Sequence, residues 1–150
     1  MPFRRPGKDE SKRDRKSSQS FDFLGFTHYW ARSLKGNWVV KKKTAKDRLS
    51  RSLKIINQWC RNNRHLPLVD QHTTLKQKLQ GHYAYFGLTG NSRSLHQYAM
   101  GVRYYWHKWL RRRHRQSNNW DWEWFENTIE ANYPLPPPRI VHSVYARAKP

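Results

Sequence analysis

Apolar residues recur at helical spacing through the middle of the chain, and this periodicity constrains the fold more than any other feature. Between residues 44 and 63, one face of a helix would carry Leu49, Leu53, Ile56 and Cys60. The opposite face of the same stretch is rich in Lys and Arg. The pattern predicts an amphipathic helix that buries one side and presents a basic ridge on the other.

Two further stretches show the same periodicity. The predicted helix over 70–86 places four side chains on one face, namely Leu75, Leu79, His82 and Phe86. The predicted helix over 92–113 has a longer apolar side, made of Leu95, Ala99, Val102, Trp106, Trp109 and Leu110. Roughly opposite that side lie Tyr104, His107, Lys108 and Arg111. Since each helix can bury its apolar side only against the others, we expect a three-helix bundle.

The segments between these helices carry start and stop signals. Thr44 and Asp47 have the spacing of a capping box at the start of the first helix. Pro67 disfavours helix at the residue before it and so separates the first helix from the second. Between the second and third helices, the expected capping residues are Gly87 or Gly90 and then Asn91 or Ser92.

The chain before the bundle divides into two parts. Residues 1–20 are rich in charge and nearly free of aromatic residues, which predicts a disordered basic tail, either an unstructured leader or a phosphate-binding arm. Residues 21–30 and 38–43 favour β-structure and flank a Gly-Asn turn signal, so we expect a β-hairpin over 21–43. An isolated hairpin is marginal in water, and this one needs a surface to pack on.

After the bundle, residues 120–132 predict a short acidic and aromatic helix. Four prolines among residues 134–138 force an extended course on the tail, residues 133–150. The predicted fold is therefore mainly α, with a small N-terminal β-hairpin, a helical domain over 44–132 and an extended Pro-rich tail.

The distribution of charge indicates the partner. The chain carries 30 Lys and Arg against 10 Asp and Glu, a net charge of +20. Between residues 23 and 120, twenty cations face only Asp47 and Asp70, so this part alone carries +18. Such a surface repels itself unless it meets a polyanion, and interleaved Tyr and Trp favour nucleic acid over an anionic membrane.

Other functional classes have weaker support. The chain has no apolar window of about 18 residues and no secretory signal, so we expect a cytoplasmic protein without a membrane partner. Its single cysteine, Cys60, excludes an internal disulfide. Asp47 and Asp70 make no metal-binding pair, and Asp121 with Glu123 suits the start of a helix better than a catalytic site. We therefore expect no catalytic residue, metal or cofactor.

Basic and aromatic side chains form the candidate RNA-binding site. Along the first helix, a basic ridge of Arg51, Lys54 and Arg61 has almost no acidic partner at i,i+4 spacing. Residues 81–87, GHYAYFG, indicate either helix packing with a close crossing at Gly81 or base stacking by Tyr85. The full candidate set is Lys41, Lys42, Lys43, Arg48, Arg51, Lys54, Arg61, Arg64, Lys76, Lys78, Tyr85, Lys108, Arg111, Arg112 and Arg113.

Four motifs, in order, resemble the C-terminal part of group II intron-encoded reverse transcriptases, the maturases. Phe23-Leu24-Gly25-Phe26 is similar to the F-L-G-F motif of the primer-grip hairpin that ends their palm. The passages GNWVVKKKTAKDRL (36–49) and YPLPPPRIVHS (133–143) resemble the palm-to-thumb connection and a frequent bacterial ending. LQGHYAYFGLTGN (79–91) is similar to L-R-G-H-Y-A-Y-Y-G-V-x-G-N of the maturase-specific, or thumb, domain, with Gln80 where Arg is common. The resemblance covers about residues 21–148.

The resemblance implies a thumb of three roughly parallel helices that grips group II intron RNA or a template–primer duplex. The family's polymerase site, a Y-A-D-D turn, is absent from this sequence, as are the fingers and most of the palm. The leading hypothesis is an RNA-binding maturase domain that is not catalytic by itself. The alternatives are one piece of a split reverse transcriptase that needs a separate palm, a remnant without function, and a general DNA-binding protein.

Overall fold

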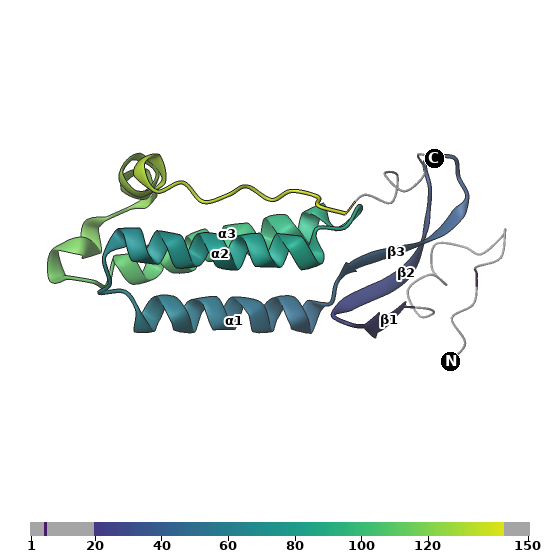
Figure 1. The fold of residues 1–150 in the computed structure, drawn as a ribbon, viewed down its shortest axis with the longest axis horizontal. Coiled ribbons are helices and arrows are strands. Elements are labelled where there is room, and N and C mark those ends of the chain that lie inside the picture. Colours follow the sequence, from purple (N-terminus) through teal and green to yellow (C-terminus); the bar gives the residue numbers. More distant parts are fainter. Residues whose placement is uncertain (1–4, 6–19, 143–150) are drawn as a thin grey trace.

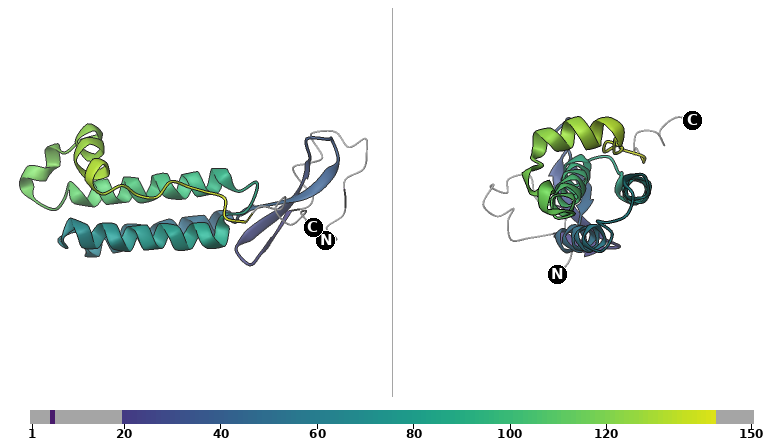
Figure 2. Two further views of the ribbon diagram at one scale, coloured as in Figure 1. Left: turned by 45° about the horizontal axis from the view of Figure 1, so that its top comes forward. Right: turned by 90° about the vertical axis from the view of Figure 1, so that its left-hand side faces the viewer.

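A computed structural model describes residue 5 and residues 20–142 (Figure 1). Three antiparallel strands extend from one end of a bundle of three long helices, and a short helical segment caps the other end (Figures 1 and 2). This arrangement confirms the predicted class, mainly helical with a small N-terminal sheet. The expected disordered tail falls almost entirely outside the described residues, as do residues 143–150.

The sheet has three strands where the sequence predicted two. β1 (Ser20–Phe23), β2 (Phe26–Arg32) and β3 (Trp38–Thr44) pair in that order. The β2–β3 hairpin is the expected one. The extra turn arises at Leu24 and Gly25, whose φ angles are 53° and 85°. A two-residue hairpin loop of this kind needs positive φ at both positions, which Gly adopts freely and Leu adopts at a cost.

α1 (Lys46–Asn62) follows β3 almost directly, and its predicted capping box is wrong. Thr44 is the last residue of β3, Ala45 holds the N-cap position, and no side chain caps the helix. The reason is that Asn91 engages Thr44 instead, accepting from its backbone N–H and donating to its hydroxyl oxygen, each at 2.8 Å. Asp47 turns outward and pairs with Arg51.

α2 (Leu68–Phe86) and α3 (Ser92–Leu110) complete the bundle. α1 and α3 run in the same direction, and α2 runs back between their ends (Figure 1). The predicted apolar sides meet at the centre, where the most buried residues are Ile56, Cys60, Leu75, Leu79, Leu95, Val102, Trp106 and Leu110. Burial of such side chains contributes roughly 1.5–3 kcal/mol each, so this shared core holds the three helices together.

Gly101 marks a close approach between two helices, and Gly81 does not. A Cβ at Gly101 would lie 2.4 Å from Cδ2 of Leu53, so α1 and α3 approach each other there. The expected close crossing at Gly81 is wrong, because that position faces open space. Gly81 lies on an exposed side of α2, away from both neighbouring helices.

A compact segment after α3 covers part of the side of that helix that the sequence predicted to lie opposite the apolar side. A 3-10 turn, η2 (Arg115–Asn119), was not predicted; it leads to α4 (Trp122–Trp124) and a π-helical turn, η3 (Phe125–Glu130). Asp121 caps α4 by accepting from the N–H of Trp124 at 2.9 Å, as expected for an acid at a helix start. Phe125 and Ile129 are fully buried. α3 ends at Leu110, three residues earlier than predicted, because the chain turns into this segment.

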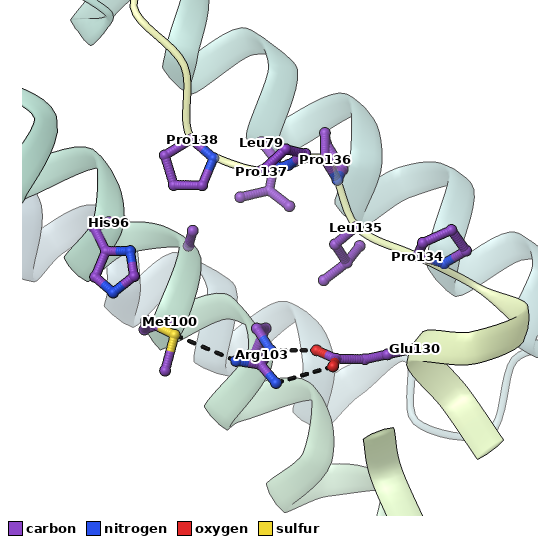
Figure 3. A pocket seen from close by; sticks show the side chains of 11 residues that line it. Leu79, His96, Met100, Arg103, Glu130, Pro134, Leu135, Pro136, Pro137 and Pro138 are labelled. Atoms are coloured by element: carbon purple, nitrogen blue, oxygen red, sulfur yellow. Dashed lines mark hydrogen bonds and ion pairs between the residues drawn. The ribbon is translucent and has the colours of Figure 1, made fainter. Parts of the chain in front are cut away.

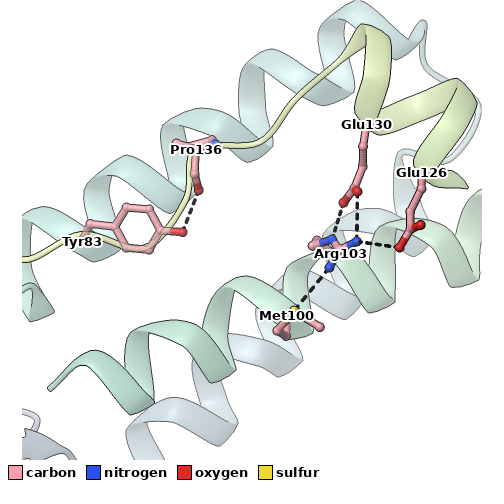
Figure 4. Close-up of polar contacts among 6 residues, drawn as sticks. All are labelled: Tyr83, Met100, Arg103, Glu126, Glu130 and Pro136. Atoms are coloured by element: carbon pink, nitrogen blue, oxygen red, sulfur yellow. Dashed lines mark hydrogen bonds and ion pairs between the residues drawn. The ribbon is translucent and has the colours of Figure 1, made fainter. Parts of the chain in front are cut away.

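Residues 133–142, which we call the strap, run back along the bundle in an extended course (Figure 1). The hydroxyl of Tyr83 donates to the carbonyl of Pro136 at 2.9 Å, a contact visible in Figure 4. At the end of the strap, the N–H groups of Val141 and His142 both donate to the carbonyl of Gly87 at 2.8 Å. The extended course predicted from the prolines is confirmed for the described part of the tail.

Candidate nucleic-acid interface

Four cations surround the indole of Trp109 at the end of the bundle away from the sheet. The guanidinium carbons of Arg61 and Arg64 lie 5.8 Å from the ring centroid, that of Arg112 lies 5.2 Å away, and Nζ of Lys108 lies 5.3 Å away. We call Trp109 and these four cations the basic cluster. Each cation–π contact at an exposed site is worth about 0.5–1 kcal/mol, so the ring supports the positive charges only weakly.

The parallel course of α1 and α3 brings this cluster together. Arg61 lies in the last turn of α1 and Arg64 just after that helix, while Lys108 and Trp109 lie in the last turn of α3 and Arg112 just after it. The two helix ends therefore meet, and cations placed there also suit the negative ends of both helix dipoles. Trp109 is held in place by its indole N–H, which donates to Oδ1 of Asn57 at 2.7 Å.

Among the residues that the structure describes, no carboxylate forms an ion pair with the basic cluster. In the described part of the chain, ion pairs form only at Arg51, with Asp47, and at Arg103, with Glu126 and Glu130. Like charges gathered around one ring repel one another, and the interaction is strongest where solvent is partly excluded. A bound polyanion would relieve this repulsion, so the cluster is the strongest candidate for phosphate contact.

The basic ridge of α1 is only partly as expected. Arg51 has an acidic partner at i,i+4 spacing, since its guanidinium lies 3.2 Å from Oδ2 of Asp47, and the expectation of a bare ridge is wrong there. Both side chains are largely exposed, and such pairs contribute little to stability. Arg48 and Lys54 are exposed without an ion pair in the described residues.

The other predicted cations are spread over the molecule. Lys41, Lys42 and Lys43 are exposed on β3, at the sheet end, and Lys43 lies over the ring of Tyr29. Lys76 and Lys78 lie on α2, exposed and half-buried respectively. Arg113 is half-buried just after α3. The structure thus gathers only part of the predicted set, at the end of the bundle where α1 and α3 finish.

Tyr85 and the F-L-G-F residues form the joint between sheet and bundle. The Tyr85 hydroxyl donates to the carbonyl of Leu24 at 2.7 Å, and its ring stacks on Phe26 at 5.6 Å. Phe26 is buried against Phe86, while Phe23 remains 59% exposed. The carbonyl of Gly25 accepts from the N–H of Ala45. Base stacking by Tyr85, half of which is exposed, stays a prediction.

A cleft of about 650 Å³ adjoins the basic cluster on the other side of α3. Its walls come from α3, η2 and the start of α4 and include Tyr104, Lys108, Arg111, Arg112, Asn118, Asn119, Asp121 and Trp122. His107 also lines it but is buried, contrary to its predicted place opposite the apolar side. The reason is Trp122, whose ring lies 4.3 Å from the imidazole, together with the Trp120 carbonyl, which accepts from Nε2 at 2.8 Å.

A second groove, of about 410 Å³, lies between α3 and the strap (Figure 3). The prolines at positions 134 and 136–138, together with Leu79, Ala99 and Leu135, make most of its surface apolar. Arg103 and Glu130 both line it. The guanidinium of Arg103 donates to both carboxylate oxygens of Glu130 and lies 3.7 Å from Oε1 of Glu126 (Figure 4). Arg103 is therefore a structural cation that ties η3 to α3 and is not free to bind phosphate.

Two buried titratable groups with shifted pKa values lie in the core of the bundle. Burial raises the pKa of the Cys60 thiol to about 12, although Lys78 acts in the opposite direction. Burial lowers the pKa of His82 to about 4. Within residues 20–142, no three His, Cys, Asp or Glu side chains are placed to hold a metal ion. No helix in that range has the length and apolar character needed to cross a bilayer.

Sequence reasoning missed the central member of the basic cluster. Trp109 falls on the apolar side of α3 and was assigned to the core, whereas the structure leaves it half-buried. The signal was present in the stretch KWLRRR (108–113), where a tryptophan lies among four cations. The contribution of Arg61 and Arg64 to the same cluster depends on the pairing of α1 with α3 and cannot be seen in the sequence.

Comparisons with known proteins gave no match, either to a family model, to a curated protein or to a solved structure.

Proposed function

We propose that this chain binds structured RNA as a maturase-type domain and that it acts by binding, without a catalytic site or cofactor of its own. The observation that carries the proposal is the basic cluster. Four cations from two helices converge on one indole without a neutralising carboxylate in the described residues. Phosphates supply the missing negative charge, and a half-buried aromatic ring among cations is typical of nucleic-acid surfaces.

The resemblance of four sequence motifs to group II intron maturases supports intron RNA as the target. Two of these motifs connect the sheet to the bundle: residues 23–26 make the turn against α2, and residues 79–91 supply Phe86 and Asn91, which hold the sheet. We accordingly propose a cytoplasmic, nucleic-acid-associated protein that contacts a folded intron or an RNA–DNA duplex.

The test is a comparison of two RNAs at one salt concentration. A group II intron transcript and an unstructured RNA of equal length are each titrated with the protein, and duplex DNA serves as a third ligand. We expect the intron to bind at least tenfold more tightly than either of the others. Equal binding to all three would indicate a general basic protein, and absence of binding in dilute buffer would contradict the proposal.

A second candidate, one piece of a split reverse transcriptase, is favoured by the exposure of the sheet. Phe23 and Leu24 are 59% and 68% exposed, and every residue of β1 is exposed. In the part of the chain that the structure describes, β1 is an edge strand, and exposed apolar residues at a sheet edge suit the addition of another strand. Primer extension by this chain mixed with a separately encoded palm, but by neither alone, would support this candidate; no extension by the mixture would contradict it.

A further inference from the structure

The cleft beside the basic cluster differs from the rest of the basic surface because it is concave, aromatic and polar at once. Its volume of about 650 Å³ lies in the range of sites that enclose small ligands. Tyr104 and Trp122 are 52% and 42% exposed, so part of each side chain is accessible to solvent. Exposed rings in a cleft can stack on a planar ligand, which a flat phosphate-binding surface does not need.

Apart from His107 and the Asp121 carboxylate, which accepts from the N–H of Trp124, the polar groups of the cleft fall into two kinds. Lys108, Arg111 and Arg112 supply positive charge, and two of them belong to the basic cluster as well. Asn118 and Asn119 supply side-chain amides that make no hydrogen bond within the described residues. Cations suit phosphate, while amides suit the edges of bases, since an amide can both donate and accept.

The walls of the cleft are held in place by contacts within the protein. Trp122 is fixed by its ring contacts with His107 at 4.3 Å and Phe125 at 5.5 Å. Arg111 donates to the carbonyl of Asn118 at 2.9 Å, which ties the end of α3 to η2. The walls are therefore positioned by the packing of the 115–130 segment on α3.

We propose that this cleft receives a single unpaired nucleotide of the bound RNA, with its base against Tyr104 and Trp122 and its phosphates against Lys108, Arg111 and Arg112. A duplex presents a convex surface and stacks its bases on one another, so it can reach the basic cluster but cannot enter the cleft. A bulged or looped nucleotide is already unstacked and enters with little cost. This inference rests on the proposed RNA binding and adds the structural element that is recognised.

The test uses two RNA hairpins that differ only in one bulged nucleotide. Fluorescence anisotropy gives the affinity of the full chain for each at one low salt concentration. Because stacking of one base on a protein ring contributes to affinity, we expect the bulged hairpin to bind about tenfold more tightly than the paired one. With 2-aminopurine at the bulge, its emission should fall on binding as the base stacks.

Tyr104→Ala should reduce this preference to less than threefold and leave the affinity for the paired hairpin unchanged. Tyr104→Phe keeps the ring and should keep the preference. Equal binding of both hairpins by the unmodified chain, or a preference that survives in Tyr104→Ala, would overturn the inference while RNA binding stands. If the unmodified chain binds neither hairpin, the inference and the proposed function both fail.

Discussion

Asn91 and Thr44 are joined by two hydrogen bonds across 47 positions of the sequence, and both residues are almost fully buried. The amide of Asn91 also donates to the carbonyl of Phe86 at 2.8 Å. One side chain therefore connects the last strand of the sheet, the end of α2 and the start of α3. These hydrogen bonds of Asn91 hold the sheet in its orientation relative to the bundle.

Asn91→Ala should lower the free energy of unfolding by about 2–4 kcal/mol, because it leaves buried donors and acceptors of Thr44 and Phe86 without partners. Urea unfolding followed by circular dichroism measures the change. Asn62→Ala is the matched control: Asn62 is exposed at the end of α1, and its replacement should change the stability by less than about 0.5 kcal/mol. Similar losses of unfolding free energy in both variants would contradict the structural role of the Asn91 hydrogen bonds.

Gly87→Ala should destabilise the protein, because a Cβ at that position would lie 2.2 Å from the carbonyl oxygen of Tyr83 and 3.0 Å from that of Arg139. The strap would have to shift from its hydrogen bonds with the Gly87 carbonyl. We expect a loss of about 1–3 kcal/mol, typical of steric overpacking, with faster proteolysis of the strap. Gly81→Ala, within α2 and six residues before Gly87, provides the control. It faces open space and should stabilise α2 by up to about 1 kcal/mol.

His82 should make the fold sensitive to acid. Its ring lies between those of Tyr98, at 3.7 Å, and Phe86, at 4.6 Å, and its pKa is lowered from 6.5 to about 4 by burial. Between these two values the unfolded chain binds the proton and the folded chain does not. Stability from this group is therefore full above pH 6.5 and falls by about 3 kcal/mol as the pH drops towards 4.

His82→Phe removes the titrating group and should flatten this part of the stability profile, measured by thermal unfolding between pH 4 and 8. His65→Gln, at an exposed loop residue, should leave the profile as it is. If the stability of His82→Phe falls below pH 6.5 as steeply as that of the unmodified chain, another group causes this loss of stability.

Cys60 should be almost unreactive in the folded protein. Its pKa of about 12, against an ordinary 9.0, makes the thiolate roughly a thousandfold rarer at pH 8 than in the unfolded chain. Because it is the only cysteine of the sequence, labelling by a thiol reagent reports on this residue alone. We expect complete labelling in urea and very slow labelling without it. Rapid labelling of the native protein would place Cys60 outside the core.

The helices could be predicted from the sequence because their apolar spacing reflects burial directly. Leu75, Leu79 and Leu95 are all fully buried, as their positions indicated. Local sequence signals gave wrong predictions where contacts between distant residues determine the structure. The sequence predicts Thr44 as a helix N-cap, but in the structure Thr44 is hydrogen-bonded to Asn91, which lies 47 residues away.

The same reasoning explains what could be predicted of the candidate site. The excess of cations on α1 and α3 was visible, because charge needs no knowledge of the fold. Their convergence on Trp109 was not, since it follows from the parallel packing of two helices. The cleft was hidden for a similar reason: it exists only because residues 115–130 pack on the side of α3 that carries His107.

The most direct test of the account is the salt dependence of RNA binding by two variants of equal charge. One replaces the four cations of the basic cluster, Arg61, Arg64, Lys108 and Arg112, with Gln. The other replaces four exposed cations at the sheet end with Gln, namely Lys35, Lys46, Arg93 and Arg139. Each phosphate contact adds about 0.7–0.9 to the slope of log affinity against log salt. The account predicts that the slope for intron RNA falls by about 3 in the first variant and by less than about 1 in the second, and equal slopes in the two variants would contradict it.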